Sequence, residues 1–555
     1  MKPPPLQRRY LASFRVPQVS HRFTDVLVIG SGVAGNAAAI HAASVPGIEV
    51  LLLAKASLEE CSTYYAQGGI AAVLAPEEHE DSLDSHIEDT IEAACGLADP
   101  AVVRIVVEEG VRRVEELMAW GARFDQKDGR IQFTREGGHS RPRIVHTGDT
   151  TGKEIERTLL VEVQKATAIL PLRETFAIDL ITRDGECRGA LVHRPSGDLQ
   201  AVWAKRTILA TGGAGRLYRE TTNPIVTTGD GLAMGLRAGA TLRDLEFIQF
   251  HPTTLYVAGA DRFLISEAVR GEGARLVDKN RERFMTRYHP RGEMAPRDTV
   301  SRSIMKRMRE LGDNKVFLDL SGIPPERVLE RFPRIREFCL GFGIDILSEP
   351  IPVRPSAHYT IGGLRVDPVG HTDVPGLFAA GEVTASGLHG ANRLGSNSLL
   401  EGLVFGARAG EQAAHEALGA VLRPAPFEPA ANEIWPGDIK GKDHLDLADL
   451  RSSLQSEMWR HVGIERTGDN LRRTLRQIEE WAPYVLEATF HHPIGWTLQN
   501  MMATGYAITL AALRREETRG VHFRADFPER DDARWARHQD MKIEDLTLHA
   551  EETGE

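Results

Sequence analysis

The sequence predicts an α/β protein with a discontinuous Rossmann-like domain, an α+β capping domain inserted into it, and a C-terminal helical bundle. Three observations support this architecture. A short apolar run ends in a Gly-x-Gly-x-x-Gly turn that starts at residue 30, and an Ala-rich stretch follows, as in a strand, tight turn and helix. Motifs rich in Arg and His occupy the region from about residue 245 to residue 359. After residue 447, apolar residues recur at three- and four-residue spacing, which indicates helices.

Length and composition set the outer limits of the function. The chain has 555 residues, of which 42% are hydrophobic and 26% charged, and its formal net charge is −11. No apolar run approaches the ~20 residues that a membrane helix needs. The acidic balance argues against broad binding to a phosphate backbone, which requires clustered Lys and Arg. We therefore expect a soluble protein with no membrane and no nucleic-acid partner.

The four cysteines and the N-terminus bear on the compartment. The cysteines lie far apart and form no Cys-x-x-Cys pair, so we expect no metal site, no disulfide scaffold and a reducing, cytoplasmic environment. Residues 1–22 carry several Arg and three consecutive Pro but no acid, and they lack the apolar core of a secretory signal. We predict a disordered extension there, with an organellar transit peptide as the alternative.

The first strand and turn predict a dinucleotide site. An apolar run at residues 24–29 leads into Gly30, Ser31, Gly32, Val33, Ala34 and Gly35. Glycine lets the backbone approach a pyrophosphate closely, and the helix that follows offers unpaired N–H groups at its positive end. A second apolar run at residues 50–53 should end in an acid if the ligand were NAD. Ala54 and Lys55 follow instead, which argues against NAD.

Three further segments favour FAD. Residues 62–69 are rich in hydroxyl, amide and glycine groups, as expected of a loop that lies along a flavin; the cofactor-binding candidates in it are Ser62, Thr63, Tyr65, Ala66, Gln67, Gly68 and Gly69. Residues 207–213 form another strand that enters a glycine turn. Residues 376–382 end in Glu382, whose carboxylate could hold the ribityl chain. Together the segments predict a FAD-binding domain.

The same signals divide the chain. We expect a disordered extension at 1–22, a FAD-binding domain built from 23–244 and 360–417, and a capping domain at 245–359. A Pro-rich linker follows at 418–445, and a C-terminal helical domain covers 446–555. The cofactor domain is therefore discontinuous in sequence.

Four cationic residues in the Gly- and Pro-marked motifs predict an anion site beside the flavin. They are His251, Arg297, His358 and Arg393. A chain with a net charge of −11 has no general surplus of cations, so their presence in loop motifs suggests selection for a local anion. Guanidinium groups form bidentate hydrogen bonds with carboxylates. We therefore expect a small dicarboxylate to bind here.

Together these motifs resemble the succinate dehydrogenase and fumarate reductase flavoprotein family, over nearly the whole chain from Asp25 to Asp532. The stretch from Gly387 to Glu401 matches a segment that the whole family shares. Ser62 stands where the respiratory members carry a histidine attached covalently to FAD, so the resemblance implies noncovalent FAD. It also implies cofactor contacts at Lys55, Asp230, Glu382, Ser398 and Leu399.

Within this family, residues 134–140 resemble the branch that oxidises L-aspartate, in which the glutamate at the place of Glu136 faces the substrate amino group. By the same resemblance, Arg393 holds one substrate carboxylate, and His251 and His358 hold the other. Arg297 is implied to transfer a proton when fumarate is reduced and to position aspartate when it is oxidised. Arginine is an unusual acid, so a relay through Glu267 is expected. Ser266 replaces the usual threonine before it.

The implied reaction is FAD-dependent oxidation of L-aspartate to iminoaspartate. Dioxygen, which yields hydrogen peroxide, or fumarate would accept the electrons, and the product would pass to quinolinate synthase in the first step of NAD biosynthesis. Two alternatives stay open. One is a flavoprotein subunit of succinate dehydrogenase or fumarate reductase, against which Ser62 and Glu136 count. The other is a flavin-bearing protein that binds nucleic acid, against which the net charge counts.

Overall fold

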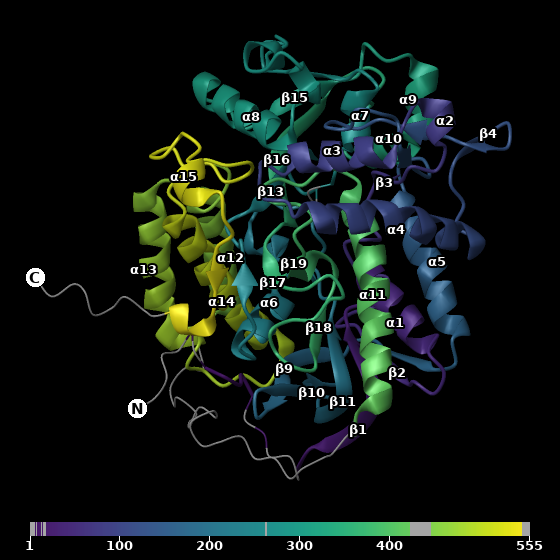
Figure 1. Cartoon of the computed structure of the whole chain (residues 1–555). Coiled ribbons are helices and arrows are strands. Elements are labelled where there is room, and N and C mark those ends of the chain that lie inside the picture. The colour runs from purple at the N-terminus through teal and green to yellow at the C-terminus, as the bar shows by residue number, and fades with distance from the viewer. Residues whose placement is uncertain are drawn as a thin grey trace, which may run out of the picture.

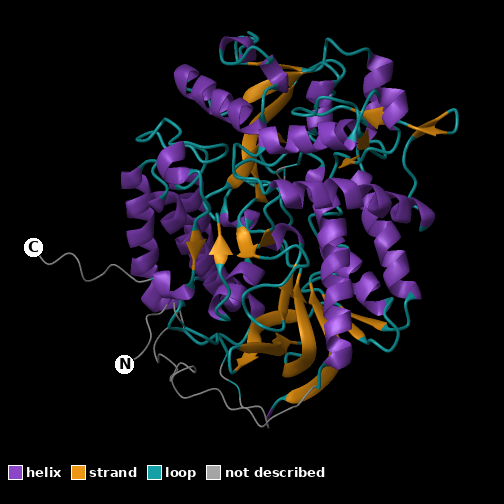
Figure 2. Ribbon diagram, in the orientation of Figure 1, coloured by secondary structure: helices purple, strands orange, loops and turns teal. Residues whose placement is uncertain are grey.

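The computed structural model describes residues 6, 8–12, 14, 18–260, 263–421 and 446–546. A seven-stranded sheet lies at the base of the molecule (Figures 1 and 2). Its strands run in the order β8-β2-β1-β11-β10-β9, and β18 pairs with β11 outside this path. Their bounds are β1 Ser20–Ile29, β2 Val50–Leu53, β8 Ile169–Leu172, β9 Phe176–Arg183, β10 Glu186–His193, β11 Leu199–Leu209 and β18 Leu377–Ala379.

The register of this sheet brings four distant segments together. β1, β2, β8, β11 and β18 are parallel to one another. β10 runs antiparallel to β11, and β9 runs antiparallel to β10. Ile29 lies opposite both Leu53 and Leu209, and Leu209 lies opposite Ala379. The four strands therefore end level, and the turns that follow them meet at one edge. Ligands of α/β sheets bind at this carboxyl edge.

Two helices from opposite ends of this domain pack on each other. They are α1 (Val33–Ala43) and α11 (Asn397–Gly419), seen side by side in Figure 1. Glycines on α11 permit the contact: a Cβ on Gly406 would lie 2.5 Å from the carbonyl oxygen of Ala34, and one on Gly410 would lie 2.3 Å from that of Ala38. The sheet and this helix pair confirm the predicted discontinuous α/β fold.

A second body, at the top of Figure 1, is built around the four-stranded sheet β13-β16-β15-β14. These strands are β13 Ile248–Leu255, β14 Arg275–Val277, β15 Val316–Asp319 and β16 Ile351–Thr360, and the helices are α7 Glu267–Gly271, α8 Arg297–Leu311, α9 Pro325–Arg331 and α10 Pro333–Leu340. Its apolar core uses residues from 255 to 353. This α+β body is the predicted cap. Its exact boundary with the FAD-binding domain stays our proposal.

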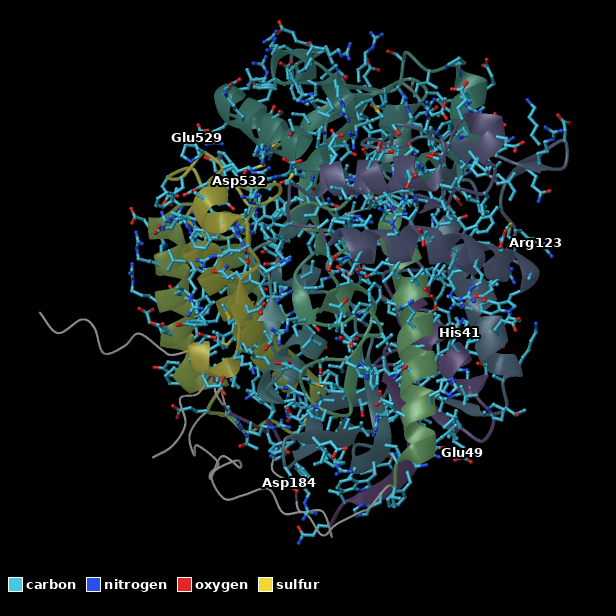
Figure 3. All side chains as sticks on the ribbon, viewed as in Figure 1. His41, Glu49, Arg123, Asp184, Glu529 and Asp532 are labelled. Atoms are coloured by element: carbon cyan, nitrogen blue, oxygen red, sulfur yellow. The ribbon has the colours of Figure 1, made fainter. Side chains whose placement is uncertain are left out.

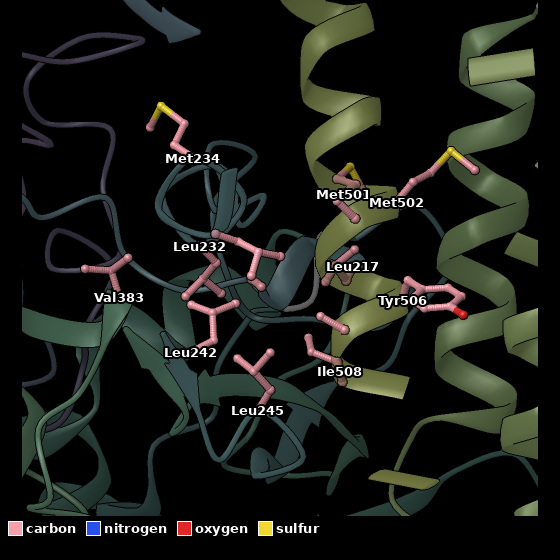
Figure 4. Packing of buried hydrophobic residues seen from close by; sticks show 14 of the residues in the cluster. Leu217, Leu232, Met234, Leu242, Leu245, Val383, Met501, Met502, Tyr506 and Ile508 are labelled. Atoms are coloured by element: carbon pink, nitrogen blue, oxygen red, sulfur yellow. The ribbon is translucent and has the colours of Figure 1, made fainter. Parts of the chain in front are cut away.

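The C-terminal bundle consists of α12 (Leu447–His461), α13 (Gly468–Val485) and α14 (Pro493–Arg514). Figure 4 shows α14 side chains, among them Met501 and Tyr506, near apolar residues of the cofactor domain such as Leu217 and Leu242. All of these residues belong to one buried cluster. The bundle is therefore part of the main core and not an appended module.

The remaining elements are short or lie between the two larger sheets. The helices are α2 Pro76–His79, α3 Leu83–Ala93, α4 Pro100–Ala119, α5 Thr151–Lys165, α6 Asp230–Arg237 and α15 Asp532–Trp535. The strands are β3 Ile70–Ala71, β4 Gln126–Lys127, β5 Arg130–Ile131, β6 Phe133–Thr134, β7 Ile144–Val145, β12 Leu242–Arg243, β17 Gly363–Arg365, β19 Thr384–Ala385 and β20 Asp540–Met541. The 3₁₀ turns are η3 Gly215–Leu217, η4 Met285–Arg287, η5 Gly292–Met294, η6 Gly381–Val383 and η7 Ile543–Asp545.

The N-terminal prediction is wrong where the structure describes this segment. Tyr10, Leu11 and Phe14 are buried in a cluster with Trp203 and Trp496. The backbone N–H of Leu11 donates to Asp179 Oδ2 at 2.7 Å. The apolar residues set between the Arg and Pro residues of this stretch supply the anchor, and the overall composition concealed them. Most of the predicted linker at 418–445 lies outside the described residues. Among the helices that the structure describes, none has the length and apolarity needed to cross a bilayer.

Candidate active site

The main cavity lies where β1, β2, β11 and β18 end. Fourteen of the residues predicted to bind the cofactor line it: Gly30, Ser31, Gly32, Val33, Ala34, Lys55, Ser62, Thr63, Tyr65, Ala66, Asp230, Glu382, Ser398 and Leu399. The same wall includes His358 and Arg393 from the predicted anion site. The structure therefore joins the cofactor candidates and part of the substrate candidates in one continuous space.

At one part of the cavity, the glycine turn holds β1 and α1 together. A Cβ on Gly35 would lie 1.8 Å from the carbonyl oxygen of Gly30, so only glycine allows this approach. The N–H of Val33 donates to Thr63 Oγ1 at 3.0 Å. The first turn of α1 thus faces the cavity at the positive end of the helix, where N–H groups bind phosphate oxygens.

The acid that the sequence lacks after β2 comes from another element. Lys55 Nζ lies 2.5 Å from Asp230 Oδ2, at the start of α6. Lys55 Nζ also donates to Thr228 Oγ1 at 2.7 Å, and Asn500 Nδ2 on α14 donates to Asp230 Oδ1 at 2.8 Å. A carboxylate and an ammonium group therefore stand together where the sequence alone shows only a lysine.

The polar groups of the cavity fit a flavin dinucleotide. Burial raises the pKa of Glu382 to about 7, although its carboxylate accepts the N–H of Thr360 at 2.9 Å. Thr211 Oγ1 and Arg393 Nε are buried and have no hydrogen-bond partner within the described part of the chain. Buried polar groups normally have partners. Both residues line the main cavity, so their lack of partners agrees with a polar ligand of this kind.

Four cofactor candidates do not line this cavity. Gly35 packs behind the turn, as described above. Gln67, Gly68 and Gly69 line a smaller neighbouring cavity, which they share with Glu136. A Cβ on Gly68 would lie 3.1 Å from Glu136 Oε1. This loop therefore lies beside the glutamate predicted to face the substrate.

The two candidate substrate arginines meet at one amide. Gln249 Oε1 on β13 accepts from Arg393 Nη1 at 3.0 Å and from Arg297 Nη1 at 3.2 Å. Arg393 Nη2 also donates to Ser398 Oγ at 2.5 Å, and its guanidinium lies 4.4 Å from the ring centroid of Tyr359. Burial and the charge of Arg297 lower the pKa of Arg393 to about 10, so Arg393 is still cationic at neutral pH. The pair forms a buried, doubly positive anchor.

His251 and His358 are adjacent and uncharged. Their ring centroids are 5.2 Å apart. Burial and then Arg297 lower both pKa values well below the ordinary value, so both rings are neutral at pH 7. His251 Nδ1 accepts the N–H of Thr253 at 3.3 Å, which leaves its proton on Nε2. The histidines can thus donate hydrogen bonds to a carboxylate without adding charge.

Glu136 and Glu267 are both buried near Arg297, and their pKa values move apart. Burial and the charge of Glu267 raise the pKa of Glu136, whose Oε2 accepts from Ser396 Oγ at 2.8 Å. Burial also acts to raise the pKa of Glu267, but Arg297 and Arg270 outweigh it, so the net shift is downward. Arg297 Nε lies 2.7 Å from Glu267 Oε2. Glu267 is thus an anionic partner of arginine, and Glu136 is the carboxylate available to a further cation.

Sequence reasoning left several contributors without a role. Gln249 stands in the same motif as His251, and Ser396 stands between Arg393 and Glu401, so both lay within motifs already singled out. Arg270 lies three residues after Glu267 on α7, and the two are paired at 3.4 Å. Thr222, whose Oγ1 lies 2.8 Å from His358 Nδ1, carries no motif that would have identified it. Asp298, which directly follows Arg297, pairs with Arg302.

The chain matches two known protein families. Residues 25–399 match the FAD binding domain family, and residues 494–552 match the fumarate reductase flavoprotein C-terminal family. The chain is 42% identical to the L-aspartate oxidase of Streptomyces coelicolor, covering 96% of this chain and 94% of the relative. It is 45% identical to that of Mycobacterium bovis, over 91% of this chain and 92% of the relative.

Solved structures agree in fold. A variant FrdA of E. coli quinol fumarate reductase superposes with a TM-score of 0.87 and 33% identity, over 94% of this chain and 95% of that one. Mycobacterium smegmatis Sdh1 superposes with a TM-score of 0.81 and 34% identity, over 92% and 90% of the two chains. The likeness extends through the cap and the C-terminal helices, because it covers nearly the whole chain.

Proposed function

The chain belongs to the L-aspartate oxidase family within the fumarate reductase flavoproteins, and from this premise we propose that it oxidises L-aspartate to iminoaspartate with FAD. When bound, FAD would supply the acceptor for the hydride of the substrate α-carbon, and the electrons would go on to dioxygen, which gives hydrogen peroxide, or to fumarate. The reaction is the first step of de novo NAD biosynthesis. The residues that line the main cavity would hold the cofactor.

The observation that carries this proposal is the position of Glu136 beside the arginine anchor. Two arginines and two neutral histidines suit a dicarboxylate. A buried carboxylate next to them would repel such a ligand, and it becomes useful only if the ligand also carries an ammonium group. Aspartate has both carboxylates and that ammonium group, whereas succinate has only the carboxylates. This favours the oxidase over a respiratory subunit.

In this proposal each residue has a physical task. Arg393 pairs with one substrate carboxylate, and His251 and His358 donate to the other. Glu136 holds the α-ammonium group and can take its proton. Glu267 keeps Arg297 oriented toward the substrate. Closure of the cap over the site would exclude water.

The compartment and the fate of the product are also proposals. The structure describes all four cysteines, and each is a free thiol, which fits a reducing compartment such as the cytoplasm. A relative from Nicotiana tabacum is named as chloroplastic. Iminoaspartate would be consumed by quinolinate synthase.

Anaerobic mixing tests the proposal directly. The FAD-loaded protein is mixed with L-aspartate, and separately with succinate, while the oxidised flavin absorbance is followed. We expect aspartate alone to bleach the flavin, and peroxide to form when air is admitted. Bleaching by succinate alone would overturn the proposal and move the protein to the respiratory branch.

A further inference from the structure

The segment after α14 passes between the helical bundle and the cap helix α8 (Figure 1). We call residues 519–521 the C-terminal loop. Its backbone contacts two elements of the candidate active site. The carbonyl oxygen of Gly520 accepts from Arg302 Nη1 on α8 at 3.0 Å. The N–H of Val521 donates to the carbonyl oxygen of Ala391, two residues before Arg393, at 3.0 Å.

The loop also supports Arg393 indirectly, through an apolar cluster. Val521 is buried in a small apolar cluster with Ala391, Phe247 and Tyr359. The ring of Tyr359 in turn carries the guanidinium of Arg393 at 4.4 Å. Displacement of Val521 would therefore reach Arg393 through the cluster that contains Tyr359.

On its other side, the loop reaches the helix that begins at Arg297. Arg302 Nη2 is paired with Asp298 Oδ2 at 2.7 Å, directly after Arg297. Asp298 Oδ1 accepts from Asn392 Nδ2 at 3.4 Å, which closes a ring of contacts back to the segment of Arg393. The loop thus touches both elements that carry the candidate substrate arginines.

Ion pairs of the buried Arg519 hold the loop itself in place. Arg519 is 1% exposed, and its Nε lies 2.6 Å from Glu517 Oε1. Its Nη2 lies 2.7 Å from Asp532 Oδ1, and its Nη1 donates to the carbonyl oxygen of Cys95 at 2.9 Å. Asp532 is labelled in Figure 3, on the C-terminal segment beside the cap. The loop is therefore a rigid point against which the other elements can be fixed.

We propose that Gly520 and Val521 are positioning residues that set the separation of Arg297 and Arg393, and thereby the affinity for a dicarboxylate. This inference rests on the proposed function, because it takes the two arginines as the carboxylate site. The C-terminal segment then contributes to substrate binding although it touches no substrate.

Gly520 offers a sharp test with a matched control. Its φ is +53°, and a Cβ there would lie 2.2 Å from the carbonyl oxygen of Ala391, so Gly520→Ala must change the spacing between the loop and the segment of Arg393. Gly312, at the C-terminal end of α8, has φ +61° and no atom within 4 Å of its Cβ position among the described residues. Gly312→Ala therefore imposes the same backbone strain without the steric clash.

The experiment titrates each FAD-loaded variant with succinate and follows the flavin spectrum. We expect the succinate Kd of Gly520→Ala to rise on the order of tenfold or more above that of Gly312→Ala, because small misplacements of binding groups have large effects. The KM for aspartate should rise in parallel, while the FAD Kd and thermal midpoint match the control. An unchanged succinate Kd would overturn the inference. So would a rise accompanied by an equal loss of FAD affinity, since that would indicate general unfolding.

Val521→Ala covers the case in which Gly520→Ala does not fold. It removes support under Tyr359 without a clash, and we expect a smaller rise in the succinate Kd with the FAD Kd unchanged. A succinate Kd equal to wild type in this variant would also overturn the inference. The wild-type protein separates the two claims. If its flavin is not reduced by L-aspartate, the proposed function is wrong. If its flavin is reduced normally but the variants keep the wild-type succinate Kd, only the proposed role of the loop is wrong.

Discussion

Glu136 and Arg297 lie against the same glycine: a Cβ on Gly395 would lie 3.0 Å from Glu136 Oε2 and 2.9 Å from Arg297 Nη2. The acid and the base are thus neighbours without forming an ion pair of their own, because Arg297 is engaged by Glu267. Glu136 is therefore free to pair with the ammonium group of a zwitterionic ligand, while the neighbouring arginines suit its carboxylates.

Glu136→Gln should weaken aspartate use and spare fumarate. A hydrogen bond to a charged group contributes about 1.5–3 kcal/mol, so we expect the KM for aspartate to rise roughly 10- to 100-fold. Fumarate has no ammonium group, and its reduction should change little. Steady-state kinetics with both substrates measure this, with Glu330→Gln on the exposed face of α9 as the control. Equal loss of both activities would remove the specificity role of Glu136.

The aspartate affinity should also depend on pH in one direction. Burial and Glu267 raise the pKa of Glu136, so acidification protonates this carboxyl before an ordinary one and removes the partner of the ammonium group. The ratio of the aspartate Kd to the succinate Kd should therefore increase as the pH falls through that raised pKa. Spectral titrations across pH measure the ratio, and it should be flat in Glu136→Gln. A flat ratio in the wild-type protein would contradict the prediction.

Arg393→Lys should weaken both aspartate and succinate. Lysine cannot reproduce the planar fork that contacts Gln249, Ser398 and the substrate at once, and it loses the stacking on Tyr359. We expect both Kd values to rise about tenfold or more, on the scale of one lost charge-assisted hydrogen bond. Arg309→Lys, an exposed position of α8, is the control. Unchanged affinity for both ligands would show that Arg393 is not the carboxylate anchor.

Gly35→Ala should impair FAD binding. Its Cβ would meet the backbone of Gly30 at 1.8 Å, and overpacking typically costs about 1–3 kcal/mol. The turn must then open, so we expect the FAD Kd, measured by fluorescence quenching, to rise roughly ten- to hundredfold. Gly419→Ala, at the end of α11, has no neighbour within 4 Å in the described structure and serves as control. Equal FAD affinity in the two variants would refute the role of this turn.

FAD should leave the protein on acid precipitation. Ser62 lines the cavity, and its hydroxyl lies 3.3 Å from Thr227 Oγ1, so no histidine stands at this place to form a flavin bond. We expect all of the yellow colour in the supernatant. Flavin that stays with the pellet would show a covalent link elsewhere and reopen the respiratory alternative.

The local motifs could be predicted from the sequence because each is formed by residues that are contiguous in the chain. The strand, turn and helix around Gly30 form a single continuous unit. The predicted run at residues 50–53 agrees with β2, and β18 (Leu377–Ala379) lies within the predicted segment 376–382. The discontinuous fold followed from finding such units on both sides of the cap.

Contacts between distant segments were not readable in this way. Asp230 supplies the carboxylate beside Lys55 from 175 positions along the chain. Gly520 contacts Arg302 through its backbone carbonyl. Every residue has this group, so the sequence does not reveal the contact. The prediction for the N-terminal segment was wrong for another reason. A few buried apolar residues such as Tyr10 anchor this segment, although its overall composition is typical of disorder.

The pairing of β18 with β11 also determines the order of events during synthesis. Residues 207–209 of β11 can pair with residues 377–379 of β18 only after the roughly 170 residues between them have been translated. At common elongation rates this takes roughly 10–30 s. During that interval the nascent chain has an open sheet edge, and α1 lacks the helix that later covers it. Such an edge attracts other strands. The ribosome-bound chain therefore completes its flavin pocket only after most of its length has emerged.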